Sequence, residues 1–469
     1  MTDKYKDTIV AVATPYGSGG LAVVRLSGPD ALKIADNAWR GKHLPEMESH
    51  TARLGQITDG DNSIIDSAVA LVFKAPHSFT GEDTVEFSLH GSLWIQREVV
   101  RRLTELGARP AGPGEFSQRA FLNGRLDLAQ AEGVADLINA SSRAAHRLAM
   151  SQLKGEFSSR LETLRNQLVE LASLLELELD FSEEDVEFAD RSQLLSLADS
   201  TAMMLRRLTD SYASGMAFKT GVPVAIAGAP NVGKSTLLNF MLNEEKAIVS
   251  NIPGTTRDII EDSAEIDGIL FRFSDTAGLR NTNDEIESIG IEKAKERIAK
   301  SRIILWMADA SNAYSNKIDE IMQYISRFAD KKNLILLNKS DIADGSYEAK
   351  ALKEKIKSYK KENTEIETIA ISAKTGAGTS QLKEYLVRSA KEEFNPDNEL
   401  IVTNARHHAA LKLGLEAINR VREGIESGIS ADFVAQDIRE ALHHLGEVTG
   451  SVTTDTLLAT IFSRFCIGK

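Results

Sequence analysis

The segment of residues 228–235 has the composition of a phosphate-binding loop. It reads Gly-Ala-Pro-Asn-Val-Gly-Lys-Ser and directly follows an apolar run at 222–227. Glycines let backbone amides surround phosphate oxygens, while a lysine reaches the β- and γ-phosphates and a serine hydroxyl binds Mg²⁺. Lys234 is therefore a candidate catalytic cation and Ser235 a candidate Mg²⁺ ligand. The candidate nucleotide-binding residues of this segment are Asn231, Val232, Gly233, Lys234, Ser235 and Thr236.

Three further segments follow predicted strands and complete a nucleotide site. Asp275-Thr276-Ala277-Gly278 would place a carboxylate near Mg²⁺ and a backbone N–H near the γ-phosphate. Asn338-Lys339-Ser340-Asp341 would select guanine, because the Asp341 carboxylate accepts hydrogen bonds from a ring N–H and an exocyclic amine that adenine cannot present that way. Ser372-Ala373-Lys374 would close over the base. Since such a site rejects an analogue lacking those hydrogen bonds by about 10⁴ to 10⁵, the sequence predicts GTP.

These motifs, which span roughly residues 220–391, resemble the translation-factor-like GTPases. In regulatory GTPases a glutamine commonly follows the Asp-x-x-Gly element and orients the attacking water, but that position is Leu279 here. A leucine side chain forms no hydrogen bond. An arginine finger raises the rate of hydrolysis by about 10³ to 10⁵, so the missing charge and the missing water-orienting group are a large loss. We therefore expect other groups to supply both.

Length, composition and charge set the broad class of the protein. The 469 residues are 42% hydrophobic and 26% charged, which predicts a globular protein of about three domains. One cysteine, no apolar stretch approaching 18 residues and mixed charges at the start predict a cytoplasmic protein without a membrane span. The net charge of −13 argues against bulk electrostatic binding of nucleic acid. We therefore expect no DNA partner, whereas a local RNA-binding face is compatible with this charge.

The rest of the chain predicts the elements that must position these residues. Residues 92–106 are predicted to form a helix with one apolar face. Asp267-Gly268 lies between two extended segments and predicts a hairpin whose antiparallel strand is at the sheet edge. Residues 211–221 are interpreted as a linker. A stripe at steps of three and four predicts a long amphipathic helix in a bundle, with a coiled-coil seam as the alternative, and consists of Phe157, Leu161, Leu164, Leu168, Leu171 and Leu175.

These patterns predict a multidomain fold. Because the helical residues after 404 are too few to form a generous core alone, we expect the α/β block to be inserted into a helical domain. The fold class is then an α+β N-terminal domain, an all-α helical domain and an inserted α/β P-loop GTPase domain. The expected bounds are 1–118 for the α+β domain, 119–217 and 392–469 for the two helical parts, and 218–391 for the inserted domain.

Three motifs extend a resemblance over the whole chain. They are Ser-Asn-Ile-Pro-Gly-Thr-Thr-Arg-Asp at 250–258, Phe-Cys-Ile-Gly-Lys at 465–469, and residues 113–117 with 120–123. Together they resemble the MnmE (TrmE) family of tRNA modification GTPases. The resemblance implies an N-terminal domain that binds folate and dimerises, so that the chain forms a homodimer. It also implies a heterotetramer with the flavoprotein MnmG (GidA), and only this partner binds FAD. It also implies addition of an aminomethyl or carboxymethylaminomethyl group to C5 of the wobble uridine, position 34 of certain tRNAs.

The resemblance further implies ions and catalytic residues. In this family K⁺ sits near the place of an arginine finger, and the matching residues are Asn231, Ser250, Ile252 and Thr255. Thr256 matches the second Mg²⁺ ligand beside Ser235. Glu287 matches the family's catalytic glutamate, whereas by itself it would be interpreted as a solvated acid. The same loop adds to the GTP-binding set Ser250, Asn251, Ile252, Pro253, Gly254, Thr255 and Thr256.

The one-carbon donor implied by the resemblance is a reduced folate, 5,10-methylene- or 5-formyl-tetrahydrofolate. The family's folate contacts match Arg25, Glu86, Arg125 and Lys469. A carboxylate can accept hydrogen bonds from the pterin ring, and a cation can pair with the glutamate tail. Cys466 in the terminal motif matches a cysteine that matters for tRNA modification in the family, so it is a candidate catalytic residue with an open chemical role.

The alternative class is a GTP-switched RNA-binding or ribosome-assembly factor resembling Era, without one-carbon chemistry. Such a factor is expected to end in a basic domain, whereas residues 394–469 contain 7 Lys and Arg against 10 Asp and Glu. A further alternative treats the N-terminal domain as a dimerisation module only. The pairs His407-His408 and His443-His444 are interpreted as structural or surface residues, because adjacent residues on a helix point to different faces.

Overall fold

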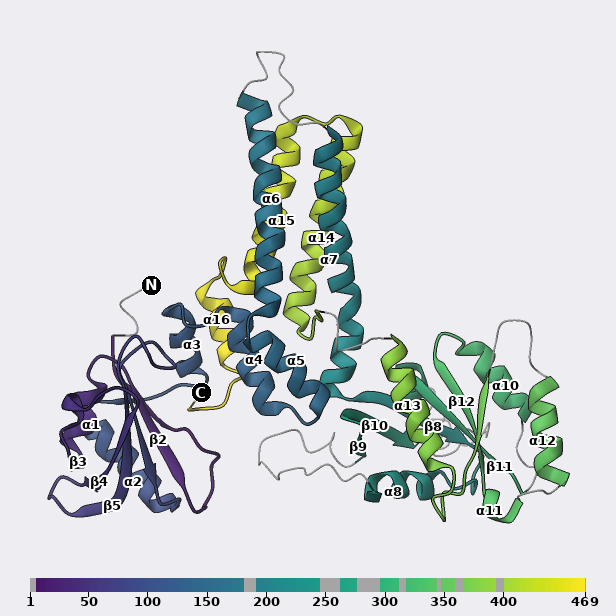
Figure 1. Ribbon diagram of the computed structural model, residues 1–469, viewed down its shortest axis with the longest axis horizontal. Coiled ribbons are helices and arrows are strands. Elements are labelled where there is room, and N and C mark those ends of the chain that lie inside the picture. The colour runs from purple at the N-terminus through teal and green to yellow at the C-terminus, as the bar shows by residue number, and fades with distance from the viewer. Residues whose placement is uncertain are drawn as a thin grey trace, which may run out of the picture. The chain divides into compact units, whose positions relative to one another are not determined.

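The chain forms two compact units (Figure 1). The first unit contains Met1–Ile138, Met150–Leu205 and Ala409–Lys469, and the second contains Asn139–Ala149 and Arg206–His408. Within the described ranges, no helix is long and apolar enough to cross a membrane. The computed structural model describes residues 6–180, 191–244, 262–275, 296–311, 318–343, 347–358, 366–393 and 400–468.

The first unit is built on a sheet with strand order β3-β4-β5-β6-β2-β1-β7, in which the pairing is antiparallel except between β1 and β7. Side chains alternate across it, so that Val85, Phe87 and Leu89 are buried on the face covered by α1 (Ala31–Asn37) and α2 (Leu93–Glu105). Helix α2 confirms the helix predicted at 92–106. The strands are β1 (Ile9–Val12), β2 (Ala22–Ser27), β3 (Trp39–Arg40), β4 (Thr51–Thr58), β5 (Ile64–Phe73), β6 (Thr84–Leu89) and β7 (Arg109–Pro110), and a short 3₁₀ helix spans Leu44–Glu46.

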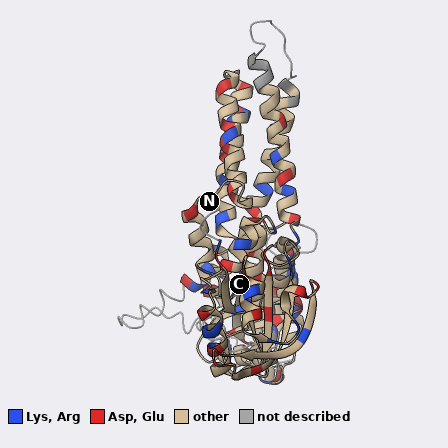
Figure 2. Cartoon of the chain, turned by 90° about the vertical axis from the view of Figure 1, so that its left-hand side faces the viewer, with Lys and Arg blue, Asp and Glu red and all other residues tan. Residues whose placement is uncertain are grey.

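Long helices make up the rest of the first unit. The predicted stripe is confirmed, because all six of its residues are buried along α6 (Glu156–Asp180), which packs against α15 (Ala431–Thr449) (Figure 1). Acidic and basic residues are interspersed along the long helices in the view of Figure 2. The other helices that contribute to this unit are α3 (Glu115–Leu122), α4 (Leu128–Asn139), α5 (Arg143–Leu153), α7 (Arg191–Thr220), α14 (Ala405–Ser427) and α16 (Asp455–Phe462).

The end of the chain lies against the sheet of the first unit. Ile467 forms an antiparallel bridge with Pro113, and the N–H of Gly114 donates to the Cys466 carbonyl over 3.3 Å. A Cβ on Gly468 would lie 2.3 Å from the backbone oxygen of Val12 at the end of β1, so the close approach of the two backbones requires glycine there. The terminal motif is therefore joined to the strand domain through backbone contacts.

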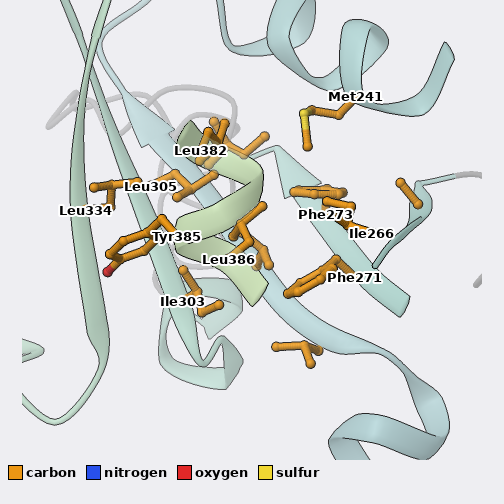
Figure 3. Packing of buried hydrophobic residues seen from close by; sticks show 14 of the residues in the cluster. Met241, Ile266, Phe271, Phe273, Ile303, Leu305, Leu334, Leu382, Tyr385 and Leu386 are labelled. Atoms are coloured by element: carbon orange, nitrogen blue, oxygen red, sulfur yellow. The ribbon is translucent and has the colours of Figure 1, made fainter. Parts of the chain in front are cut away.

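The second unit has a sheet with strand order β13-β12-β11-β8-β10-β9. Its pairs are parallel except for β9–β10, which confirms the predicted hairpin and the antiparallel edge strand. A buried cluster lies between one face of the sheet and α13, where Leu382, Tyr385 and Leu386 pack on strand residues (Figure 3). The strands are β8 (Val222–Gly228), β9 (Ser263–Ile266), β10 (Ile269–Asp275), β11 (Ile303–Asp309), β12 (Lys332–Asn338) and β13 (Glu367–Ala370).

Helices cover both faces of this second sheet. Helices α8 (Lys234–Glu244) and α13 (Thr379–Glu393) contribute to the cluster of Figure 3, while α10 (Ile318–Arg327) and α12 (Tyr347–Ser358) contribute to a separate cluster with Ile304, Trp306 and Ile335. A short helix, α11 (Ser340–Ala343), follows β12. This layered α/β arrangement, together with the strand domain and the long helices, confirms the predicted multidomain fold class.

The interpretation of residues 211–221 as a linker is wrong. Helix α7 continues without a break to Thr220, and β8 begins two residues later at Val222. Gly215 within this helix is a packing residue, because a Cβ there would lie 2.3 Å from the Val402 carbonyl oxygen. The N–H of Val402 also donates to the Ser211 hydroxyl over 3.1 Å. The small side chains thus let the returning chain lie directly on the helix.

The β9–β10 hairpin caps the start of α5. The first N–H groups of a helix have no partner within the helix and need one outside it. Here the Ala144 N–H donates to the Gly268 carbonyl over 2.9 Å, and the Arg143 N–H donates to the Glu265 carboxylate over 3.2 Å. Ala144 is also buried in the core of the second unit. The first turn of α5 therefore belongs structurally to the α/β part of the chain.

A buried arginine organises charged groups in the first unit. The side chain of Arg119 on α3 is only 1% exposed and forms ion pairs with Asp7 over 2.7 Å, Glu82 over 3.2 Å and Glu115 over 3.0 Å. Arg109 pairs with Asp7 and Glu115 as well. Burial by itself would raise the pKa of Glu115, but hydrogen bonds from Arg109, the Gly112 N–H and Arg119 outweigh it and hold the pKa below its ordinary value.

We expect Glu115→Gln to destabilise the first unit by about 2 kcal/mol at pH 7, because it leaves the buried Arg119 charge without one of its three acidic partners. The pKa of Glu115 in the folded chain lies below its unfolded value near 4.5, so its contribution is complete above pH 4.5 and is lost as pH falls through the folded pKa. The difference from wild type should therefore shrink in acid. Urea unfolding of the full chain across pH measures it, with Glu98→Gln, at a half-buried position that pairs with Arg101, as the control. A pH-independent difference would contradict this account.

Candidate nucleotide and folate sites

The carboxyl ends of the parallel strands meet at one edge of the second sheet. In the strand register, Asp275 lies opposite Ile226, and Asp309 lies opposite Asn338. The loops that follow β8, β10, β11, β12 and β13 therefore open at the same edge, which is where ligands bind in open α/β sheets. The predicted nucleotide-binding segments begin at the ends of four of these strands.

The phosphate-binding loop lies between β8 and α8. Asn231 has a φ of +62°, in the left-handed region that asparagine tolerates better than most residues. Lys234 is only 8% exposed, and its Nζ donates to the carbonyl oxygens of Gly228 and Ala229 over 3.0 Å each. The loop thus holds a positive charge within its own turn. Ser235, in the first turn of α8, is exposed at this edge.

One buried amide joins the phosphate loop to the loops predicted to bind the base. The Asn338 Nδ2 donates to the Val232 carbonyl over 2.7 Å, and its Oδ1 accepts from the Ala373 N–H over 2.9 Å. Asn338 is 3% exposed, so loss of either hydrogen bond would leave a buried polar group unpaired. A Cβ on Gly233, which has a φ of +98°, would lie 2.4 Å from that Nδ2. The glycine and the amide therefore fit together as one junction.

The predicted guanine-selecting residues lie in the two loops that Asn338 brings together. Asp341 is exposed on α11, directly after β12. The N–H of Ser340 donates to the Ile371 carbonyl over 3.1 Å, which ties the start of α11 to the end of β13. In the second loop, the Ser372 hydroxyl accepts from the Thr375 N–H over 3.2 Å. Ala373 is buried and Lys374 is exposed beside them.

Part of the predicted site lies outside the described residues, as does Leu279. For Asp275 the structure gives the backbone, at the end of β10 and parallel to β8. The Ser235 hydroxyl at the start of α8 is a hard oxygen donor near that strand end, so the donors at this edge fit Mg²⁺. The predicted residues outside the described part of the chain are Ser250, Asn251, Ile252, Pro253, Gly254, Thr255, Thr256, Thr276, Ala277, Gly278, Glu287 and Lys469.

The structure brings two of the predicted folate contacts together in the first unit. Arg25 and Glu86 are directly opposite each other in β2 and β6, and the Arg25 Nε lies 2.7 Å from the Glu86 Oε1. The Arg25 guanidinium lies 5.8 Å from the ring centroid of Phe79 and 5.6 Å from that of Phe116. The sequence analysis predicted neither aromatic residue, because Phe79 stands in no motif, and Phe116, within the 113–117 motif, is not among the residues that match the family's folate contacts.

Arg125 lies against the same loop as Phe79. A Cβ on Gly81 would lie 3.1 Å from the Arg125 Cγ, and Arg125 itself is exposed. The loop is held in place by a hydrogen bond from the Asn123 Nδ2 to the Thr80 carbonyl over 2.8 Å. These contacts provide a cation next to the Phe79 loop, which fits the chemistry of a folate tail.

The terminal cysteine and the histidine pairs occupy ordinary structural environments. Cys466 is exposed in the terminal motif, and no cluster of His, Cys, Asp and Glu suited to a metal ion occurs among the residues whose placement is described. His407 is buried, and its ring accepts a hydrogen bond from Arg406 over 2.9 Å. His408 stacks on Tyr212 with the ring centroids 4.3 Å apart. The His443 and His444 rings contact each other edge to face.

Asp309 lies at the nucleotide edge but belongs to none of the sequence motifs. It is 8% exposed at the end of β11, where its carboxylate is paired with Lys339. Burial by itself would raise the pKa of Asp309, but hydrogen bonds from Lys339 and Ser311 outweigh it and keep the pKa below its ordinary value. The only signal available in the sequence is an acid at the end of a predicted apolar strand.

A phosphate loop after the first strand of a mostly parallel sheet, joined through Asn338 to a guanine-type loop, defines the chain as a P-loop GTPase. The family model "MnmE helical domain" matches residues 128–466, and the model "GTP-binding protein TrmE N-terminus" matches residues 8–125. The chain belongs to the MnmE family of tRNA modification GTPases.

Individual relatives agree with the family models. The tRNA modification GTPase MnmE of Christiangramia forsetii is 48% identical and covers 99% of this chain and 100% of its own length. The protein of the same name from Bacteroides thetaiotaomicron is also 48% identical with the same coverage. Among solved structures, Era from Aquifex aeolicus bound to GDP and AlF₄⁻ is 29% identical with a TM-score of 0.30, covering 41% of this chain and 65% of that chain.

Proposed function

We propose that this GTPase adds an aminomethyl or carboxymethylaminomethyl group to C5 of the wobble uridine of certain tRNAs. A reduced folate, 5,10-methylene- or 5-formyl-tetrahydrofolate, donates the carbon, and the flavoprotein MnmG (GidA) acts with the chain and brings FAD. The observation that carries this proposal is the 48% identity with tRNA modification GTPases through the nucleotide site and both flanking parts. Mass spectrometry of tRNA nucleosides tests it, since cells without the chain should lose the C5-substituted uridine.

GTP hydrolysis in this proposal depends on two cations beside the phosphate loop. Ser235 and Thr256 would hold Mg²⁺, which would neutralise charge on the β- and γ-phosphates. Asn231 would be one of the residues that hold K⁺, which would supply the charge that an arginine finger supplies elsewhere. Glu287 polarises the attacking water, directly or through a second water, and so replaces the group missing at Leu279. The proposed K⁺ ligands are Asn231, Ser250, Ile252 and Thr255.

We expect Glu287→Ala to lower K⁺-stimulated kcat about 100-fold, which is the usual scale for loss of a positioned general base. GTP affinity should stay within about threefold, because the carboxylate acts on the water and not on the nucleotide. Single-turnover hydrolysis in KCl, compared with NaCl, measures both effects. Glu285→Ala removes a neighbouring acid and serves as the control. K⁺-stimulated hydrolysis within a few-fold of wild type would exclude this role for Glu287.

The folate site in this proposal is built around the Arg25–Glu86 pair. The Phe79 ring, which is 38% exposed beside the Arg25 guanidinium, offers flat apolar surface for a pterin ring, whereas the Phe116 ring is fully buried and supports the guanidinium from within. The Glu86 carboxylate can accept hydrogen bonds from the ring donors, and Arg125 can pair with the glutamate tail. Lys469, the residue after Gly468, is the fourth proposed contact.

Arg25→Met should weaken binding of 5-formyl-tetrahydrofolate at least about tenfold, because it removes a partly buried charge and leaves Glu86 without its partner. Isothermal titration on the full chain measures the dissociation constant. Arg97→Met, on the exposed side of α2, is the matched control and should bind as wild type does. If purified wild-type protein itself bound no reduced folate, the proposed site would be removed altogether.

The proposed partners are a second copy of the chain, MnmG and tRNA. The chain acts as a homodimer in the cytoplasm, forms a heterotetramer with MnmG and handles tRNA. Because its net charge is −13, we propose that MnmG supplies much of the RNA contact. This predicts weak tRNA binding by the chain alone and much tighter binding by the complex. Cys466, exposed in the terminal motif beside the strand domain, is proposed to take part in the modification step.

A further inference from the structure

The ends of β11 and β12 carry an ion pair that no sequence motif includes. In the strand register Asp309 is opposite Asn338, the residue that precedes Lys339. The Lys339 Nζ lies 2.5 Å from the Asp309 Oδ2, and the two side chains are 35% and 11% exposed. A charge-assisted hydrogen bond of this length in partly buried surroundings holds a lysine more firmly than an exposed pair would.

The Asp309 carboxylate is held in place by hydrogen bonds from Ser311, in addition to its contact with Lys339. Its Oδ1 accepts from the Ser311 N–H over 2.9 Å and from the Ser311 hydroxyl over 2.6 Å. The N–H of Ala310 donates to the Asn338 carbonyl over 2.8 Å, which continues the strand pairing past the end of β11. The other carboxylate oxygen is thereby left in a set position toward Lys339.

Lys339 is constrained at both of its ends. Its backbone has a φ of +65°, a left-handed conformation that few residues with long side chains adopt. Its Nζ is held by Asp309, so the four methylene groups of the side chain are fixed at both ends. A free lysine side chain samples many rotamers, and ordering it on ligand binding would weaken affinity.

We propose that Asp309 is a positioning residue, which holds the methylene stem of Lys339 as a preformed wall against the guanine base. The inference depends on the nucleotide site described above, because Lys339 belongs to the segment that is predicted to select the guanine base. The contact is the same in the ground state and the transition state. Loss of Asp309 therefore raises KM for GTP and leaves kcat unchanged, as expected for uniform binding.

The test uses the full chain with Asp309→Asn, which keeps the shape of the side chain and removes its charge. We expect KM for GTP and the dissociation constant of a fluorescent GDP analogue to rise about tenfold, with kcat within twofold of wild type. Asp309→Glu should restore part of the affinity, because it restores the charge. Asp319→Asn breaks an exposed pair with Lys355 in the same unit and should leave both constants unchanged.

A double-mutant cycle separates positioning from a merely structural role. In the Lys339→Met background Asp309→Asn should have no further effect on GDP affinity, because the side chain it positions is gone. Additive effects of the two substitutions would overturn the proposal. So would an unchanged KM in Asp309→Asn, or a fall in kcat at constant KM in protein whose folding is shown to be intact by thermal unfolding. Absence of GDP binding by the wild-type chain would instead refute the nucleotide site itself.

Discussion

Asp341→Asn should invert the nucleotide preference of this GTPase from GTP to XTP. The Asp341 carboxylate is expected to accept hydrogen bonds from the ring N–H and the exocyclic amine of guanine. An asparagine amide places a donor where xanthine carries a carbonyl oxygen and guanine carries its amine, so guanine is rejected and xanthine is accepted. Because an unmatched hydrogen-bonding pair costs about 10⁴ in specificity, kcat/KM for GTP should fall by at least about 10³ while that for XTP rises.

Steady-state hydrolysis of both nucleotides at fixed Mg²⁺ and K⁺ measures this inversion. Asp330→Asn removes the same charge from the surface of the same unit and should keep the preference for GTP. Binding of neither nucleotide by a folded Asp341→Asn protein would assign Asp341 a structural role. An unchanged preference for GTP would contradict guanine selection by this side chain.

Lys234→Ala should lower kcat/KM for GTP by about 10³. The Nζ of Lys234 is held by the carbonyls of Gly228 and Ala229, so its charge is already inside the phosphate loop when GTP arrives. A preorganised charge at the transferred phosphoryl group stabilises the transition state without reorganisation of the site. Removing it also leaves two carbonyl oxygens of the loop without a donor, so nucleotide affinity should fall as well.

Lys234→Arg tests whether charge alone is sufficient. The planar guanidinium is larger than an ammonium and cannot occupy the same position between the two carbonyls, so we expect little recovery. Single-turnover hydrolysis separates the loss in the chemical step from the loss in binding. Thermal unfolding controls for folding. Hydrolysis by Lys234→Ala within tenfold of wild type would show that the lysine has no major catalytic part.

Much of the fold could be predicted because the patterns were local. The stripe from Phe157 to Leu175 is periodic within one helix, and each central strand of the second unit is a short apolar run next to a turn. The linker predicted at 211–221 is wrong, because α7 continues through it and Gly215 provides room there for the backbone at Val402. Such a close approach involves residues nearly 200 positions apart and leaves no local pattern.

The contacts around the proposed sites could be predicted only in part for the same reason. The phosphate and guanine loops are contiguous motifs, so their residue types could be read directly from the sequence. Residues that support them come from other strands: Asp309 reaches Lys339 from β11, and Phe79 and Phe116 reach Arg25 from separate segments. Strand order and register bring these residues together, and a single sequence does not encode either in a local pattern.

We propose that GTP hydrolysis by this chain serves wobble-uridine modification. Mass spectrometry would measure the modified nucleosides in bulk tRNA from wild-type cells, from cells without the gene, and from cells whose only copy carries Cys466→Ser. We expect the C5-substituted wobble uridine to be lost in both altered strains and to be restored by the wild-type gene. A normal nucleoside profile in cells without the gene would contradict the claim and leave a GTP-switched factor with another target.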